Sequence, residues 1–273
     1  MSPELERRSR LLLETIAGLG RVVVAFSGGV DSALVLAAAV RAVGPERSVG
    51  VIGVSPSLPR RELEAALEVG RQVGARLERI ETREMEREGY RRNGLDRCYH
   101  CKTELYTLLS DYRSRNGYQA ILDGTNADDR LDQRPGHQAA RELGVVSPLL
   151  LAGLGKGDIR ELSRIWGVPI WRKPSSPCLS SRIPHFVEVT VEKLGAIEKA
   201  EERLAALGLH EFRVRHHGDV ARLELHPEDW ALILDPQTRS TVVAELRGLG
   251  FRHVALDLDG FHSGSLSSAA QGS

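Results

Sequence analysis

Residues 27–32, Ser27-Gly28-Gly29-Val30-Asp31-Ser32, join a short β-branched segment to an amphipathic one. The segment before them, residues 21–26, is Arg-Val-Val-Val-Ala-Phe and predicts a buried strand, whereas residues 31–43 have the periodicity of a helix. Consecutive glycines let successive backbone N–H groups converge on one anion, and the N-terminus of a helix adds partial positive charge there. The stretch therefore predicts a strand–turn–helix unit that cradles a phosphate group.

This phosphate cradle, residues 27–32, differs from the two best-known nucleotide-binding loops. The chain contains neither Gly-x4-Gly-Lys-Ser/Thr nor Gly-x-Gly-x-x-Gly. We expect the backbone and the hydroxyl groups of the turn to bind the phosphates, through Ser27, Gly28, Gly29, Asp31 and Ser32. A branched side chain at Gly29 is expected to fill the cradle and to conflict with the backbone angles there. The alternative is a glycine-rich turn that only connects a strand to a helix.

Apolar and amphipathic segments alternate up to residue 172. Such alternation predicts an α/β domain with a doubly wound parallel sheet over residues 1–172. The further strands are expected at 48–54, 76–81 and 120–123, and the further helices at 59–73, 102–116 and 156–166.

Ligands of doubly wound sheets lie at the carboxyl ends of the strands. Ser55 follows the expected strand at 48–54, where an adenosine would be held. The segment 123–129, Asp-Gly-Thr-Asn-Ala-Asp-Asp, follows another strand and offers carboxylates for magnesium or ribose. We therefore add Ser55, Gly124, Asn126 and Asp128 to the candidate nucleotide-binding residues. A solvated Asp-rich turn is the alternative for the second segment.

The character of the sequence changes after residue 172. Residues 173–188 are rich in Pro and Ser and predict a loop or linker, which carries Cys178. Residues 189–262 contain helical segments, a hairpin signal at Gly218-Asp219 and a last strand, and so predict a smaller α+β domain. Residues 263–273 are small and polar and are expected to be disordered.

The composition restricts the class of protein. The 273 residues are 41% hydrophobic and 27% charged, which provides for a core, and no window approaches 18 uncharged apolar residues. Charges near the start argue against a secretory signal, and three cysteines do not make a disulfide framework. Lys plus Arg equal Asp plus Glu at 37 each, which disfavours a long nucleic-acid partner. We expect a cytoplasmic protein with reduced thiols that binds neither membranes nor nucleic acids.

The cradle motif after a buried strand resembles the signature loop of the PP-loop ATP pyrophosphatases, which have an adenine nucleotide alpha hydrolase-like fold. Further motifs lie along nearly the whole chain: VSPSLP at 54–59, DGTNADD at 123–129, RPG at 134–136, PCLSSR at 177–182, RVRHHGD at 213–219 and DLDGFHSGS at 257–265. Together they are similar to the LarE family, ATP-dependent sulfur transferases of nickel-pincer cofactor biosynthesis.

The resemblance implies a concrete reaction. The protein would adenylate the carboxylates of pyridinium-3,5-biscarboxylic acid mononucleotide with ATP and Mg²⁺, release pyrophosphate, and insert sulfur to give thiocarboxylates. An acyl-adenylate gives a poorly electrophilic carboxylate a good leaving group, and a thiolate is a suitable soft nucleophile to displace AMP. The resemblance also implies sulfide or another sulfur source as a partner, and a homo-oligomer.

Three cysteines carry the sulfur chemistry in this interpretation. The resemblance makes Cys178 the sulfur-donor cysteine, and Arg182 is a second catalytic candidate because a guanidinium near a thiol favours the reactive thiolate. Cys98 and Cys101 have Cys-x-x-Cys spacing, which is compatible with a redox pair, a structural zinc or idle thiols. The three-cysteine pattern favours a [4Fe–4S] cluster held by Cys98, Cys101 and Cys178, with one iron open to an added sulfide. Whether the sulfur of Cys178 is consumed or recycled stays open.

Two arginines are candidates for binding the substrate. Arg213 and Arg215 are two residues apart on a predicted strand, so both side chains point to one face. Guanidinium groups suit the phosphate of the mononucleotide, and surface arginines of an Arg-rich chain are the alternative. The resemblance also points to Glu201 and Glu224 as acidic residues near the substrate or a metal.

Two other functions are consistent with the sequence. A PP-loop tRNA thiolase also combines the cradle motif with Cys-x-x-Cys and a third cysteine, although the neutral net charge disfavours it. A non-catalytic adenine-nucleotide-binding protein is the other alternative, and it would leave the three cysteines without a task.

Overall fold

The computed structural model describes residues 1–131, 135–174 and 176–262 and divides the chain into two compact units. Unit 1 comprises Met1–Arg87 and Asp96–Ser176, and unit 2 comprises Glu88–Leu95 with the chain from Pro177 onward. The tail at 263–273, which we expected to be disordered, lies outside the described residues. No helix in the described part of the chain is long and apolar enough to cross a membrane.

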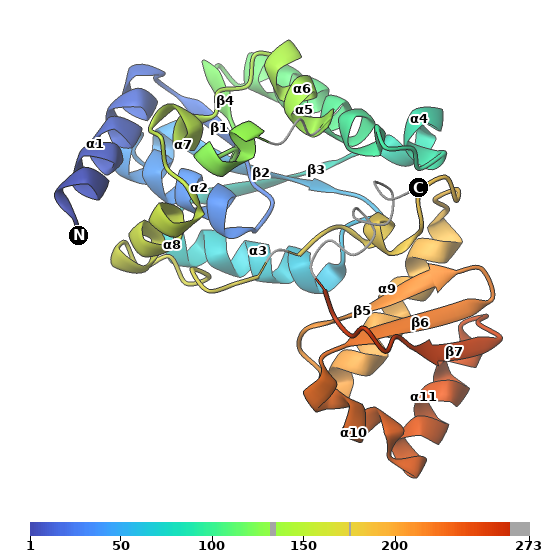
Figure 1. Ribbon diagram of the computed structural model, residues 1–273. Helices are drawn as coiled ribbons and strands as arrows, with labels where there is room; N and C mark the ends of the chain where they lie inside the picture. Colours follow the sequence, from blue (N-terminus) through green and yellow to red (C-terminus); the bar gives the residue numbers. More distant parts are fainter. Residues whose placement is uncertain (132–134, 175, 263–273) are drawn as a thin grey trace. The chain divides into compact units, whose positions relative to one another are not determined.

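Unit 1 contains a four-stranded parallel sheet in the order β3-β2-β1-β4 (Figure 1). Its strands are β1 (Val22–Ala25), β2 (Ser48–Val54), β3 (Arg76–Glu81) and β4 (Ala120–Leu122). The chain leaves β1 toward β2 on one side and returns to β4 on the other, so the strand order reverses between β1 and β4. Crevices at such reversals are where doubly wound sheets bind ligands.

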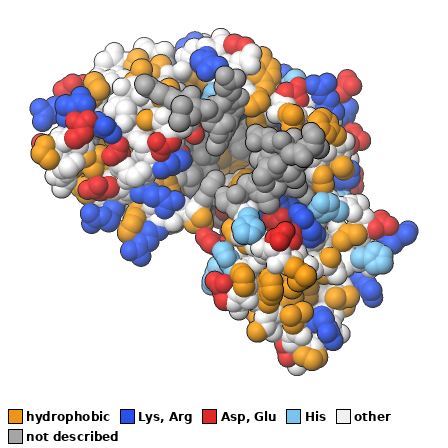
Figure 2. Space-filling view, viewed as in Figure 1, with side chains coloured by type: hydrophobic (Ala, Val, Ile, Leu, Met, Phe, Trp, Pro, Cys, Tyr) orange, Lys and Arg blue, Asp and Glu red, His pale blue; other side chains and the backbone are white. Residues whose placement is uncertain are grey.

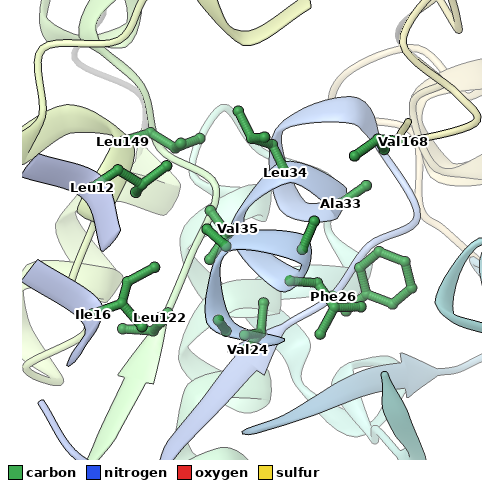
Figure 3. Close-up of a cluster of buried hydrophobic side chains, with 14 of the residues drawn as sticks. Leu12, Ile16, Val24, Phe26, Ala33, Leu34, Val35, Leu122, Leu149 and Val168 are labelled. Carbon is green, nitrogen blue, oxygen red and sulfur yellow. The ribbon is translucent and has the colours of Figure 1, made fainter. Parts of the chain in front are cut away.

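Helices cover both faces of this sheet, which confirms the predicted doubly wound fold. They are α1 (Pro3–Gly18), α2 (Val30–Val43), α3 (Arg60–Val73), α5 (Arg97–Arg115), α6 (Pro135–Glu142), α7 (Pro148–Leu151) and α8 (Lys156–Ile165). Alternate residues of β1 point to opposite faces. Val22 and Val24 join the core formed with α1, α2, α3, α7 and α8, and Val23 and Ala25 join the core formed with α5 and α6. Figure 3 shows Val24 in the first of these cores, with side chains of α1, α2 and α7.

Unit 2 is a small α+β module, as the sequence predicts. Its sheet has the order β5-β6-β7, in which β5 (Phe212–His217) and β6 (Val220–Leu225) form an antiparallel hairpin and β7 (His253–Leu256) runs parallel to β6. Gly218 supplies the positive φ of 63° that the hairpin turn needs. The helices are α4 (Glu88–Arg91), α9 (Val191–Ala206), α10 (Trp230–Leu234) and α11 (Pro236–Gly248).

A short excursion of the chain, residues 88–95, belongs to unit 2 although it interrupts unit 1 in sequence. Asn93 is fully buried there, and its side-chain Nδ2 donates hydrogen bonds to the carbonyl oxygens of Pro184 (2.8 Å) and Val187 (3.0 Å). The segment that we expected to be a linker is therefore anchored to this excursion at its carboxyl end.

Candidate functional site

The phosphate cradle lies where β1 ends and α2 begins. Gly28 has a φ of +71°, and a Cβ atom built there would lie 2.6 Å from Cβ of Ala66 in α3. Gly28 is thus required both for the backbone conformation and for the close approach of α3. Gly29 is different: its φ of −85° suits any residue, and a Cβ would meet only Ser27 Oγ at 3.5 Å. Our expectation that the backbone angles at Gly29 exclude a branched residue was therefore wrong.

The hydroxyl groups of the cradle bind one another and the turn. Ser27 Oγ and Ser32 Oγ are 3.0 Å apart, and Ser32 Oγ also donates to the carbonyl of Gly29 and accepts from the backbone N–H of Ser27. The N-cap residue Gly29 offers no side chain to the first turn of α2. Because the first N–H groups of a helix have no partner within it, those of residues 30–32 face the position that an anion would occupy.

The carboxyl end of β4 closes the opposite side of the cradle. A Cβ atom at Gly124 would lie 2.9 Å from the backbone N of Ser32, so only glycine permits this approach. Asn126 is fully buried and donates from Nδ2 to Asp31 Oδ2 at 3.3 Å. Four of the predicted residues, Asp31, Ser32, Gly124 and Asn126, therefore meet at one place in unit 1.

All three acidic residues of the segment 123–129 accept hydrogen bonds within the fold, Asp129 from the backbone N–H of Asn126 at 3.0 Å. Asp123 accepts hydrogen bonds from Ser147 Oγ (2.7 Å) and Thr125 Oγ1 (2.8 Å), which fix the end of β4. Asp128 accepts from the backbone N–H of Lys156 at 2.7 Å, at the first residue of α8. Asp128 thus stabilises the N-terminus of a helix, a task that its predicted role in nucleotide binding did not include.

Ser55 lies directly after β2, as expected, in a buried hydrogen-bonded group. Ser55 Oγ donates to Glu84 Oε1 at 2.5 Å, and Ser57 Oγ donates to the same oxygen at 3.0 Å. Glu84 is 2% exposed, and its Oε2 has no hydrogen-bond partner among the described residues. Sequence reasoning missed Glu84, which orients the serine selected for adenosine binding.

Two lysines that sequence reasoning missed also flank the cradle. The Lys156 ammonium forms an ion pair with Asp31 Oδ2. The Lys173 ammonium donates to Glu62 Oε2 at 2.7 Å and to the carbonyl oxygen of Gly28 at 3.3 Å. The chain has only 5 Lys against 32 Arg. The rarity of lysine is the feature of the sequence that could have singled out these two positions.

Cys98 and Cys101 lie in the first turn of α5, three residues apart and therefore on one side of the helix. None of the three cysteines, all of which are described, is in a disulfide bond, and Cys98 is exposed. The pKa of the adjacent Lys102 is raised, first by Tyr106 and then by Cys101, Asp123 and Cys98. Within the described residues, no group of three His, Cys, Asp or Glu side chains is close enough to hold a metal ion. Cys178 belongs to unit 2.

Arg182 holds the backbone of the cysteine loop, which we define as residues 177–182. Its Nη1 donates to the carbonyl oxygens of Pro177 (2.5 Å) and Cys178 (3.1 Å), and its Nε donates to Glu201 Oε1 at 2.9 Å. Arg182 and Glu201 are both almost fully buried. Glu201 also accepts from the backbone N–H of Val214, so this ion pair connects the loop, α9 and β5.

The two candidate substrate arginines have different surroundings. Both are buried side chains of β5, so neither is a surface arginine. Arg215 donates to Glu224 Oε2 at 2.8 Å and to the carbonyl of Ser181 at 2.5 Å, and Glu224 also pairs with Arg222.

Arg213 has no ion pair among the described residues and stacks over the ring of Phe261, 4.9 Å from its centroid. Burial, with the neighbouring Arg215 and Arg182, lowers the pKa of Arg213 to about 10. Glu224 and Glu201 partly offset this lowering. A buried guanidinium without a direct ion pair has the chemistry to bind an anion.

A glycine turn and a helix N-terminus without a side-chain cap, at the reversal point of a parallel sheet, are the features by which doubly wound proteins bind the phosphate groups of a nucleotide. The family model described as NAD synthase matches residues 10–94. The chain is 40% identical to an uncharacterised protein of Synechocystis sp., over 96% of this chain and 98% of that one. It is 35% identical to the pyridinium-3,5-bisthiocarboxylic acid mononucleotide synthase of Lactiplantibacillus plantarum, over 96% of this chain and 95% of the synthase.

A third relative covers only part of the chain. The NH(3)-dependent NAD(+) synthetase of Pyrobaculum aerophilum is 31% identical over 60% of this chain and 62% of its own length. Because the mononucleotide synthase matches both units, the chain belongs to the LarE family. The resemblance inferred from the sequence motifs is thereby confirmed.

Proposed function

We propose that this protein is an ATP-dependent sulfur transferase that converts the carboxylates of pyridinium-3,5-biscarboxylic acid mononucleotide to thiocarboxylates. One observation carries the proposal: the chain is 35% identical, over 96% of its length, to a synthase of the bisthiocarboxylic acid mononucleotide. The cradle of unit 1 is consistent with it. The fold and the family support the class of enzyme, and the proposed substrate is taken from the name of the Lactiplantibacillus plantarum relative.

The first step is adenylation in unit 1. A substrate carboxylate oxygen forms a bond to the α-phosphorus of ATP, the bond from that phosphorus to the bridging oxygen breaks, and its electron pair leaves with pyrophosphate. The N–H groups of residues 30–32 bind the phosphates. The Asp31 carboxylate at the cradle suits Mg²⁺, which supplies charge neutralisation of the triphosphate when it is bound.

The second step uses the cysteine loop of unit 2. Sulfur attacks the acyl carbon of the adenylate, and AMP leaves with the electron pair of the broken C–O bond. If Cys178 gives its own sulfur, its Cβ–Sγ bond then breaks, its Cα proton is lost and dehydroalanine remains. Arg182 keeps the backbone of Cys178 in place through the carbonyl oxygens of residues 177 and 178.

The [4Fe–4S] cluster is the finer part of the proposal. Cys98 and Cys101 suit two of its ligand positions, because they lie one helical turn apart and neither is in a disulfide bond. Cys178 would be the third ligand, and the fourth iron would accept a sulfide from outside. Zinc and idle thiols are the alternatives. An anaerobic visible spectrum with iron and acid-labile sulfide counts decides among them, since only the cluster gives a brown protein containing both elements.

The proposal extends to the cellular setting and the partners of the protein. We propose a cytoplasmic homo-oligomer without a nucleic-acid partner. On the face of unit 1 seen in Figure 2, basic and acidic side chains of the described residues are interspersed, which suits a small-molecule substrate better than a nucleic acid. Light scattering tests the oligomeric state, and filter binding with bulk tRNA tests the tRNA thiolase alternative.

The proposal as a whole is tested by pyrophosphate release. Full-length protein with ATP and Mg²⁺ is expected to release pyrophosphate only when the biscarboxylic acid mononucleotide is present. Release that does not depend on the mononucleotide, or that depends on tRNA, would contradict the proposed substrate.

A further inference from the structure

Three buried arginine side chains of unit 2 lie near one another and differ in what accepts their hydrogen bonds. Arg182 donates to Glu201 Oε1 at 2.9 Å, and Arg215 donates to Glu224 Oε2 at 2.8 Å. Both also donate to carbonyl oxygens of the cysteine loop. Arg213, whose pKa is lowered by burial and then by the two other arginines, makes no side-chain hydrogen bond or ion pair with another described residue. The described part of the fold therefore does not use its N–H donors.

An aromatic ring lies beside Arg213, where the two other arginines have a carboxylate. Arg213 Cζ is 4.9 Å from the centroid of the partly buried Phe261 ring. The face of the ring attracts the cation through its quadrupole, which supports a buried charge that has no direct ion pair. A guanidinium group stacks on a ring with its flat face, and its N–H bonds lie in its own plane. The ring thus restricts the orientation of Arg213 and occupies none of its donors.

Two contacts fix the position of Phe261. Its backbone N–H donates to the carbonyl oxygen of Leu225, the last residue of β6, at 2.9 Å. Gly260 permits this approach, since a Cβ atom there would lie 3.1 Å from the same oxygen. The ring of His226 is the second neighbour, with its centroid 5.0 Å from that of Phe261, and His226 Nε2 lies 3.1 Å from Glu211 Oε2. The end of β6 therefore holds the ring that Arg213 stacks on.

We infer that Phe261 is a positioning residue for the substrate: its ring holds the Arg213 guanidinium group in the plane in which two N–H groups bind the phosphate of the mononucleotide. The inference rests on the proposed function, which supplies the mononucleotide. Two parallel N–H···O bonds require the guanidinium group and two phosphate oxygens to share a plane. A group that is already held in its plane loses less conformational entropy on binding. A carboxylate at this place would take the donors, as Glu224 does with Arg215.

The test is calorimetric binding to full-length wild type, Phe261→Leu and Phe261→Tyr. The ligands are the biscarboxylic acid mononucleotide, ATP with Mg²⁺, and inorganic phosphate with ATP and Mg²⁺ already saturating. Phe261→Leu removes the ring face and should weaken mononucleotide and phosphate binding about tenfold, whereas Phe261→Tyr keeps the face and should stay within about twofold of wild type. ATP binding should not change in either variant, because the cradle belongs to unit 1.

Phe251→Leu is the matched control, because Phe251 is 3% exposed and lies in the hydrophobic core of unit 2. The same exchange there should lower the free energy of unfolding and change none of the three affinities. A role through Arg213 also predicts non-additive effects. In an Arg213→Lys background, which has no guanidinium plane to align, Phe261→Leu should weaken mononucleotide binding by less than about twofold.

Three results would overturn the inference: wild-type affinities in Phe261→Leu, an equal loss of affinity in Phe251→Leu, or an undiminished effect of Phe261→Leu in the Arg213→Lys background. Failure of the proposed function looks different. A wild type that binds phosphate but not the mononucleotide would contradict the proposed substrate, and the phosphate affinities of the variants would then decide the role of Phe261.

Discussion

Replacing Gly28 with alanine tests the structure of the cradle without any ligand. Two costs add. An L-residue at a φ of +71° costs about 1–2 kcal/mol in the left-handed region. The new Cβ would lie 2.6 Å from Cβ of Ala66, which is bonded directly to the backbone of α3 and cannot rotate away, and such overpacking costs about 1–3 kcal/mol. We expect Gly28→Ala to lower the free energy of unfolding by about 2–5 kcal/mol.

A double-mutant cycle separates the two costs. Ala66→Gly alone should lose about 1 kcal/mol, because glycine weakens the interior of α3. In the double variant the overlap between the two Cβ atoms is gone, while the φ cost at position 28 and the glycine cost in α3 remain. The coupling between the sites should therefore be about 1–3 kcal/mol in favour of the pair. Gly157→Ala is the control, since a Cβ there meets nothing within 4 Å.

Urea unfolding followed by circular dichroism measures all four variants. Additive effects of Gly28→Ala and Ala66→Gly would show that the two residues do not touch, and a Gly28→Ala protein as stable as wild type would refute the geometry of the cradle. Gly157→Ala should be neutral or slightly stabilising in a helix.

Three further predictions concern other residues. Arg213→Lys should weaken mononucleotide binding and leave ATP binding unchanged, as calorimetry would show. Arg215→Met should chiefly lower the free energy of unfolding in urea, because it removes a partner of buried Glu224. Lys173→Met should weaken pyrophosphate binding several-fold. The Lys173 ammonium holds the carbonyl oxygen of Gly28, and because the peptide is planar and trans, the N–H of Gly29 then points to the opposite side. Burial lowers the pKa of His216 in the folded protein, so the unfolded state binds the proton more tightly. The free energy of unfolding should therefore fall as the pH drops below 6.5, the ordinary pKa of histidine. Urea unfolding on either side of that pH should show a smaller change in His216→Phe than in wild type.

Much of the fold could be predicted because its signals are local. The β-branched run at 21–26, the adjacent glycines and the helical period that follows determine the β1–turn–α2 unit within about two dozen residues. The hairpin of unit 2 depends on one turn, where Gly218 takes the positive φ that its position requires. The residues that determine each of these elements are therefore close together in the sequence.

Other elements depend on contacts that no local pattern contains. We expected a helix at 102–116, but α5 begins at Arg97 and therefore includes Cys98 and Cys101. Asp96, the N-cap residue, is of a type that commonly precedes helices, but its side chain makes no capping hydrogen bond in the structure. Residues 88–95 join unit 2 through Asn93, whose partners lie about ninety positions further along the chain.

The same limit applies to the candidate site. Spacing predicted that residues 27–32 and the segment after β4 lie together, because both follow strands of one sheet, and the structure brings them together. Lys156 and Lys173 reach the cradle from 125 and 145 residues away, and only the tertiary structure shows these pairings. Spacing also put Arg213 and Arg215 on one face, but the bond of Arg215 to Glu224 and the stacking of Arg213 over Phe261 are set by packing in unit 2.

The most direct test of the central claim is mass spectrometry of the product and of the protein from one anaerobic reaction. Full-length protein is incubated with the biscarboxylic acid mononucleotide, ATP, Mg²⁺ and sulfide. We expect the mononucleotide to gain the mass difference of sulfur for oxygen, once and then twice, only when ATP is present. With the cluster, Cys178 keeps its sulfur; if it is consumed, the product is the same and Cys178 becomes dehydroalanine. A mononucleotide of unchanged mass, beside a protein that binds ATP, would contradict the assignment as a sulfur transferase of this substrate.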